Sequence, residues 1–148
     1  MKKEIWFDMD GTIANFYGVE GWLEYIKREQ TKPYREAKPL IDMKHLAKEL
    51  NRLQKLGYTI GIISWLAKDS TKAYDNAVRT VKHDWLDAFD FPYNELHFVK
   101  YGTTKANCTR KYGGRQVLFD DNEKVRNGWN LGEAIDAVDM IEYLKGLL

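Results

Sequence analysis

The sequence predicts an α/β fold, a Rossmann-like three-layer domain with a mainly parallel sheet and a small helical cap insertion. Two observations support this prediction. Apolar, β-prone segments alternate along the chain with amphipathic helical segments, and polar residues follow the ends of the apolar strands. The 148 residues, 44% of them hydrophobic, suit one ordinary domain with one core. We therefore expect residues 1–148 to form a single domain, with residues 15–39 as a cap inserted in it.

The first half of the chain contains two predicted buried strands separated by a helix. Residues 4–8 are β-prone and apolar on both faces, which is typical of strands in parallel sheets. Residues 40–56 carry apolar side chains at helical spacing and are followed by Gly57, so an amphipathic helix is expected there. Residues 58–64 form the second predicted strand.

The second half continues the alternation. The predicted segments are a helix that begins near residue 70, a strand at 96–99, a helix at 104–112, a strand at 116–120, a weak strand at 134–135 and a helix at 138–147. Ligands of such folds bind at the carboxyl ends of the strands. Asp8, Ser64 and Asp120 end three predicted strands, so we expect them at one edge of the sheet.

The charge balance and the cysteine content argue against several functional classes. The 23 Lys and Arg residues nearly balance 22 Asp and Glu residues, so no strong positive field is available for duplex nucleic acid. The one cysteine, Cys108, has no partner for an internal disulfide, and no apolar signal segment begins the sequence, so a cytoplasmic location is expected. Apolar runs such as residues 60–63 are far shorter than the roughly 20 residues that span a bilayer. We expect no membrane segment.

Two carboxylates separated by one residue follow the first predicted strand. In the segment Asp8-Met9-Asp10-Gly11-Thr12, one carboxylate can attack phosphorus while the second donates a proton to the departing oxygen. Gly11 permits a sharp turn that leaves backbone N–H groups free to face a phosphoryl group. An ordinary Asp-Gly turn after a strand is the alternative.

Further polar residues follow two other predicted strands. The hydroxyl of Ser64 and the N–H of Trp65 would lie beside Asp8 and donate to a phosphate oxygen, although a polar residue at a strand exit is also common. Asp120 and Asp121 are adjacent like charges that a hard divalent cation would neutralise. Mg²⁺ prefers such oxygen ligands. We expect it to be held by Asp8, the backbone carbonyl of Asp10, one or both of Asp120 and Asp121, and the substrate.

A lysine is expected to complete the phosphate site. Lys105 lies at the predicted start of a helix, where anions are already favoured. There it can neutralise both the phosphate and the nucleophilic carboxylate. Lys100, at the end of the preceding strand, is the competing candidate.

These motifs, in this order, resemble the haloacid dehalogenase superfamily of phosphatases. The resemblance covers nearly the whole chain: strand-Asp-x-Asp-Gly-Thr, strand-Ser, Lys and strand-Asp-Asp. It implies that Asp8 is the nucleophile and Asp10 the general acid and base. The other roles it implies are phosphate ligands for Ser64 and Lys105, and magnesium-site acids for Asp120 and Asp121.

The opening segment Asp-Met-Asp-Gly-Thr-Ile-Ala-Asn, residues 8–15, is also similar to the start of 5′(3′)-deoxyribonucleotidase-type members. Residues 16–39 occupy the position of the helical cap in that group. Aromatic side chains in this segment can either stack on a base or sugar or belong to the core. These side chains are Phe16, Tyr17, Trp22, Tyr25 and Tyr34.

We therefore expect a magnesium-dependent phosphomonoester hydrolase that acts through an aspartyl-phosphate on Asp8. Nucleoside monophosphates are the favoured substrates within the class of small phosphorylated metabolites. A phosphatase of nucleic-acid 3′ or 5′ ends is an alternative that a compact, open cap would permit. A non-catalytic phosphate-binding or interaction module is an alternative of another class. The presence of both Asp8 and Asp10 argues against it, because a binding module has no need for both carboxylates.

Overall fold

The computed structural model describes residues 3–148. Within this range, strands form one five-stranded sheet in the order β3-β2-β1-β4-β5, and every neighbouring pair is parallel. The strands are β1 (Lys3–Phe7), β2 (Tyr58–Trp65), β3 (Glu95–Val99), β4 (Arg115–Phe119) and β5 (Ala134–Ile135). The predicted α/β fold is confirmed.

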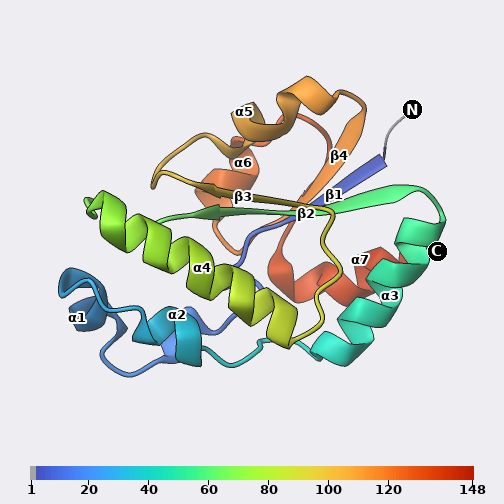
Figure 1. The fold of residues 1–148 in the computed structure, drawn as a ribbon. Coiled ribbons are helices and arrows are strands. Elements are labelled where there is room, and N and C mark those ends of the chain that lie inside the picture. The colour runs from blue at the N-terminus through green and yellow to red at the C-terminus, as the bar shows by residue number, and fades with distance from the viewer. Residues whose placement is uncertain (1–2) are drawn as a thin grey trace.

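Helices cover both faces of the sheet (Figure 1). They are α1 (Trp22–Lys27), α2 (Lys32–Glu36), α3 (Met43–Lys55), α4 (Lys72–Ala88), α5 (Lys105–Thr109), α6 (Glu123–Asn127) and α7 (Met140–Leu147). Single 3₁₀ turns occupy Phe16–Gly18, Arg110–Tyr112 and Ala137–Asp139. Helices α3, α4 and α7 lie on one face, and α5 and α6 lie on the other. No helix within residues 3–148 combines the length and the apolar character that crossing a membrane requires.

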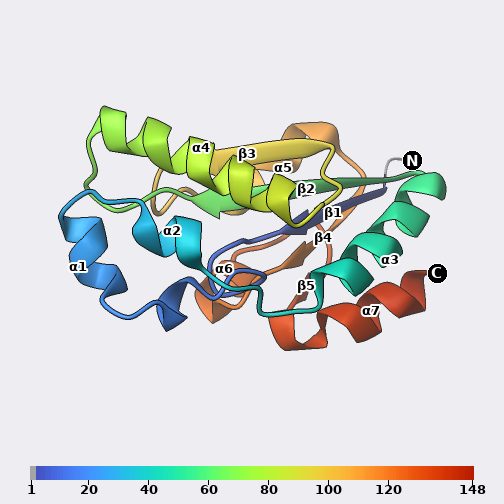
Figure 2. The same ribbon diagram turned by 60° about the horizontal axis from the view of Figure 1, so that its bottom comes forward.

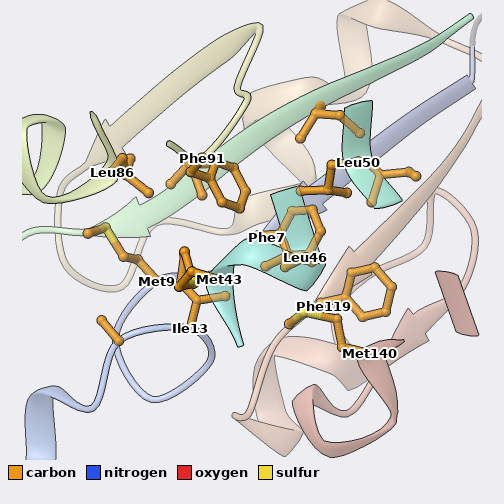
Figure 3. Packing of buried hydrophobic residues seen from close by; sticks show 14 of the residues in the cluster. Phe7, Met9, Ile13, Met43, Leu46, Leu50, Leu86, Phe91, Phe119 and Met140 are labelled. Atoms are coloured by element: carbon orange, nitrogen blue, oxygen red, sulfur yellow. The ribbon is translucent and has the colours of Figure 1, made fainter. Parts of the chain in front are cut away.

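The larger core lies between the sheet and α3, α4 and α7. Figure 3 shows Phe7 of β1 facing the same interior as Leu46 of α3 and Met140 of α7. The Phe7 ring also packs against Phe91 and Phe119, with centroid distances of 5.4 and 5.0 Å. Each such fully buried side chain contributes roughly 1.5–3 kcal/mol. This core anchors β1, and therefore fixes the position of the residue that follows it.

The observed helix bounds differ from the predicted ones at identifiable capping residues. Helix α3 begins at Met43 rather than residue 40, because the side chain of Asp42 accepts from the N–H of His45 and caps the first turn. Leu40 lies outside the helix and is exposed. Helix α6 was not predicted, since it is only five residues long. Asn122 caps it by accepting from the N–H groups of Lys124 and Val125.

Residues 15–39, the predicted cap, form a 3₁₀ turn, α1 and α2 beside the carboxyl end of the sheet (Figure 2). Two contacts hold this insertion against the start of α4. The Glu29 carboxylate accepts from the N–H and hydroxyl of Thr71 at 2.9 and 2.6 Å, and the Tyr74 hydroxyl donates to the Gln30 carbonyl at 2.8 Å. The insertion and α4 therefore form one side of the space above the strand ends.

Candidate active site

The ends of three neighbouring strands bring the acidic residues together. Asp8 directly follows β1, Asp120 directly follows β4, and Ser64 is the penultimate residue of β2. Because β1 lies between β2 and β4 and all three are parallel, these residues share one edge of the sheet.

Asp8 is a buried carboxylate that is held at both oxygens. Its Oδ1 accepts from Lys105 Nζ at 2.9 Å, and its Oδ2 accepts from the Thr12 hydroxyl at 2.9 Å. Burial alone would raise the pKa of Asp8, but the charge and hydrogen bond of Lys105 outweigh it, so the pKa lies below its ordinary value. Asp8 is therefore ionised, which is the state that a carboxylate nucleophile requires.

Lys105 joins two of the strand ends. Its ammonium is 2.9 Å from Asp8 Oδ1 and 2.8 Å from Asp120 Oδ2, and its side chain is buried. Burial works to lower the pKa of Lys105, but the two carboxylates raise it above its ordinary value, so the lysine keeps its charge. The competing candidate, Lys100, is exposed at the end of β3.

Asp121 completes a cluster of three carboxyl groups. One oxygen from each of Asp8, Asp120 and Asp121 lies within 4.8 Å of the other two. Asp121 is an exposed residue, but partial burial of its carboxyl group, followed by a hydrogen bond to Asp8 and the charge of Asp8, raises the pKa of Asp121 to about 7. Burial and the charge of Asp8 raise the pKa of Asp120 to about 6. Lys105 alone does not neutralise three carboxylates, so the cluster favours a proton or a cation.

Thr12 and Gly11 let Asp121 approach Asp8. The Thr12 hydroxyl oxygen lies 3.1 Å from Asp121 Oδ1 and accepts from the Asp121 N–H at 3.2 Å. Gly11 has a φ of +83°, and a Cβ there would lie only 2.4 Å from Asp121 Oδ2. The Gly11 N–H donates to the Ala14 carbonyl at 2.8 Å, so it is engaged within the turn. The contribution of Gly11 seen here is close packing, and the role of Thr12 was not predicted.

Asp10 contacts a different lysine, Lys82, which was not predicted from the sequence. Lys82 of α4 is completely buried and donates to Asp10 Oδ2 at 3.1 Å, Ser64 Oγ at 2.7 Å and the Trp65 carbonyl at 2.9 Å. Burial raises the pKa of Asp10 above its ordinary value, although Lys82 opposes this change. The signal in the sequence was a lysine on the apolar face of a helix, in line with Tyr74 and Val78.

Ser64 and Trp65 face different sides of the site. Ser64 is 1% exposed and, among residues 3–148, is not one of those that line the cavity described below. The Leu66 N–H donates to the Val99 carbonyl of β3 at 2.7 Å. Successive N–H groups of a strand point in opposite directions, so the Trp65 N–H points away from β3 and toward β1. The last paired residue of β2 with β1 is Ile62, so Trp65 lies beyond the end of β1. The Trp65 N–H is therefore directed toward the segment that begins with Asp8.

A cavity of about 630 Å³ opens above the acidic cluster. Asp8, Asp10, Lys105, Asp120 and Asp121 line one part of it. The aromatic side chains that line it are Phe16, Tyr17, Trp22 and Tyr34 from the insertion, with Trp65 and Tyr101 from the strand ends. Tyr25 is not part of this lining within residues 3–148: its ring and hydroxyl contact Lys32 instead.

No family model matches the sequence, and no curated protein matches it. Among solved structures, D,D-heptose 1,7-bisphosphate phosphatase from Burkholderia thailandensis is similar, with a TM-score of 0.52 and 14% sequence identity. The similarity covers 95% of this chain and 99% of that chain. The two chains share one fold. It is an α/β fold with helices on both faces of a parallel sheet, and at this identity the similarity is informative about the fold alone.

The acidic cluster has the chemistry of a site for a hard divalent cation. Mg²⁺ binds carboxylate and carbonyl oxygens, and carboxyl groups that contact one another are stabilised when a cation replaces the proton between them. The residues that would hold it are Asp8, Asp120 and Asp121. The Asp10 carbonyl, the fourth ligand expected from the sequence, belongs to the same turn.

We expect the metal-free protein to lose stability as the pH rises from 3.8 to about 7. The folded state retains protons on Asp120 and Asp121 up to these pKa values, whereas an unfolded aspartate releases its proton near 3.8. The favourable contribution is therefore complete below 3.8, declines above it as the unfolded aspartates ionise, and is fully lost once Asp120 and Asp121 ionise in the folded state. Asp121→Asn, which cannot ionise, should gain melting temperature relative to the wild type between pH 5 and pH 8 in chelator. Glu20→Gln, a control at an exposed position, should not gain melting temperature relative to the wild type. Parallel curves of melting temperature against pH for all three proteins would contradict the expectation.

Proposed function

We propose that this protein is a magnesium-dependent phosphomonoester hydrolase in which Asp8 is the nucleophile. The observation that carries the proposal is a buried, ionised Asp8 paired with Lys105, beside Asp120 and Asp121, at the base of a cavity. Asp10 lines the same cavity but is paired with a separate lysine. Two carboxylates in different electrostatic surroundings are suited to different roles in one reaction.

The reaction proceeds in two steps. An Asp8 carboxylate oxygen forms a bond to phosphorus while the bond from phosphorus to the ester oxygen breaks, and Asp10 gives that oxygen a proton. Asp10 then takes a proton from a water molecule, whose oxygen attacks phosphorus and releases phosphate and free Asp8. A bound Mg²⁺ would neutralise charge on the phosphoryl oxygens.

Lys105 and the Trp65 N–H are the phosphate ligands that we propose. Lys105 already neutralises Asp8, so it reduces the repulsion between this carboxylate and an approaching phosphate. The Trp65 N–H is directed to the same side. Ser64, expected as a third ligand, lies behind them against Lys82.

The proposed substrates are nucleoside monophosphates or other small phosphorylated metabolites. A cavity of about 630 Å³ has the size of small-molecule sites, and rings of Tyr17, Trp22 and Tyr101 in its lining are suited to a base or a sugar. The similar structure is named as a phosphatase of a sugar bisphosphate, so a chain with this fold can act on a phosphomonoester.

The test is phosphate release from a panel of substrates in the presence of Mg²⁺. The panel contains nucleoside 5′- and 3′-monophosphates, sugar phosphates, an aryl phosphate, and oligonucleotides with a 3′- or 5′-phosphate. We expect the largest kcat/KM for a nucleoside monophosphate. A preference for the oligonucleotides would move the substrate to nucleic-acid ends. No release from any member would refute the proposed activity.

Trp22→Ala should raise KM for a nucleoside monophosphate more than for a small aryl phosphate. Trp22 lines the cavity, and stacking of a base on an aromatic ring contributes about 1–3 kcal/mol, which corresponds to roughly a five- to 150-fold change. Tyr25→Ala is the matched control, because its ring lies on the same helix but contacts Lys32. Equal losses on both substrates, together with a lower melting temperature, would assign Trp22 to the core instead.

A further inference from the structure

Lys82 uses all of its hydrogen-bonding capacity inside the protein. An ammonium group has three donors, and those of Lys82 are directed at Asp10, Ser64 and the Trp65 carbonyl. The rings of Tyr34 and Phe98 lie 5.1 and 6.0 Å from Nζ. The side chain has no exposed surface and does not line the cavity among residues 3–148. Lys82 is therefore not placed to touch a substrate.

The three acceptors of Lys82 come from two different parts of the site. Ser64 Oγ and the Trp65 carbonyl belong to the end of β2, which is fixed in the sheet by β1 and β3. Asp10 belongs to the turn after β1, and its side chain is 17% exposed in the cavity wall. Lys82 thus connects a rigid strand end to a carboxylate that faces the cavity.

This connection selects one oxygen of Asp10. Oδ2 accepts from Lys82, so Oδ1 is the oxygen left for groups in the cavity. The side chain also cannot rotate toward Lys105 without breaking its bond to Lys82. Lys105 pairs with Asp8 and Asp120, so each of the two lysines serves a different carboxylate of the Asp-x-Asp pair.

Stability alone does not explain a lysine at this position. A buried ion pair is often no more stabilising than apolar residues of similar volume, because removing both charges from water is costly. The neighbours of Lys82 along the buried face of α4, Val78 and Trp85, are apolar. A methionine would fill the same space without this cost.

We propose that Lys82, anchored by Ser64 Oγ and the Trp65 carbonyl, is a positioning residue that orients Asp10 for proton transfer to the departing oxygen. This inference rests on the proposed function, since it concerns the acid of that reaction. It assigns Ser64 a supporting role through Lys82 rather than a direct contact with phosphate.

The experiment compares Lys82→Met with Val78→Ala. Val78 is fully buried one turn earlier on α4 and, among residues 3–148, does not line the cavity, so its truncation tests the effect of a general loss of packing. The measured quantities are kcat for an alkyl and an aryl phosphate, the dissociation constant of inorganic phosphate with Mg²⁺ by calorimetry, and the melting temperature. Alkyl esters need a proton on the leaving oxygen, whereas aryl esters depend on it less.

For Lys82→Met we expect kcat on the alkyl ester to fall about 100-fold and kcat on the aryl ester to fall no more than about fivefold, since a positioned acid contributes roughly 10²–10⁴-fold. The dissociation constant of phosphate should stay within about threefold, because Lys82 does not contact it. Val78→Ala should leave the alkyl-to-aryl ratio unchanged. Ser64→Ala should also lower the alkyl-to-aryl ratio, by a smaller factor than Lys82→Met. In the double variant, Ser64→Ala should lower the ratio little beyond the effect of Lys82→Met alone.

Lys82→Gln provides a second variant that keeps an amide donor near Asp10, and we expect it to fall between the wild type and Lys82→Met. An unchanged alkyl-to-aryl ratio in both Lys82 variants, or a Ser64→Ala variant that weakens phosphate binding and leaves the ratio alone, would overturn the inference. Wild-type protein that hydrolyses neither ester would instead refute the proposed function. These failures are distinguishable because the first requires an active wild type.

Discussion

Asp8→Asn is expected to lower kcat on every substrate by several orders of magnitude, on the order of 10⁴-fold or more. The substitution keeps the size of the side chain and its hydrogen bond with Thr12, but it removes the anion that attacks phosphorus. The kcat of the variant on an aryl phosphate is compared with that of the wild type. Circular dichroism and the melting temperature verify that the variant is folded. Turnover near the wild-type rate would refute nucleophilic attack by Asp8 and favour attack by a metal-activated water.

Asp10→Asn is the matched companion of this variant, because it removes the second carboxylate of the same turn. The decrease in kcat of Asp10→Asn should depend on the leaving group. It should be large for an alkyl phosphate and smaller for an aryl phosphate, whose oxygen leaves without protonation. Asp8→Asn should lower both rates by similar factors. The two variants therefore separate the nucleophile from the acid.

Exhaustive chelation is expected to abolish hydrolysis of an aryl phosphate, and added Mg²⁺ is expected to restore it. Asp8, Asp120 and Asp121 converge on one point, and without a cation their negative charge repels a phosphate dianion. Ca²⁺ should restore little activity, because it takes more ligands at longer distances and would misplace the nucleophile. Unchanged turnover of the chelated protein would refute the metal requirement.

The positions of Asp8 and Asp120 could be predicted from the sequence because they depend on strand ends. Apolar segments with β-prone residues identified β1 and β4, and parallel strands place their carboxyl ends at one edge. Asp8 and Asp120 are the residues that directly follow these two strands, so their positions are fixed by the strand ends. The turn after β1 also required a residue without a side chain beside Asp121, and the sequence has Gly11 there.

The contacts of Lys82 could not be predicted, because they depend on how α4 lies across the end of β2. Helical spacing indicates that residue 82 shares a face with Tyr74 and Val78, but it does not identify what that face covers. The different surroundings of Tyr25 and Trp22 could not be predicted for a similar reason. Both are aromatic residues of α1, and only the packing of this helix turns Trp22 toward the cavity and leaves Tyr25 beside Lys32.

Trapping with beryllium fluoride and Mg²⁺ tests nucleophilic attack by Asp8, because this reagent forms a stable mimic of an acyl phosphate on a carboxylate nucleophile. We predict one adduct per chain, located on Asp8 by fluorine NMR and structure determination, absent from Asp8→Asn and retained in Asp10→Asn. An adduct on any other residue, or wild-type protein that hydrolyses phosphate esters yet forms no adduct, would contradict the proposed covalent mechanism.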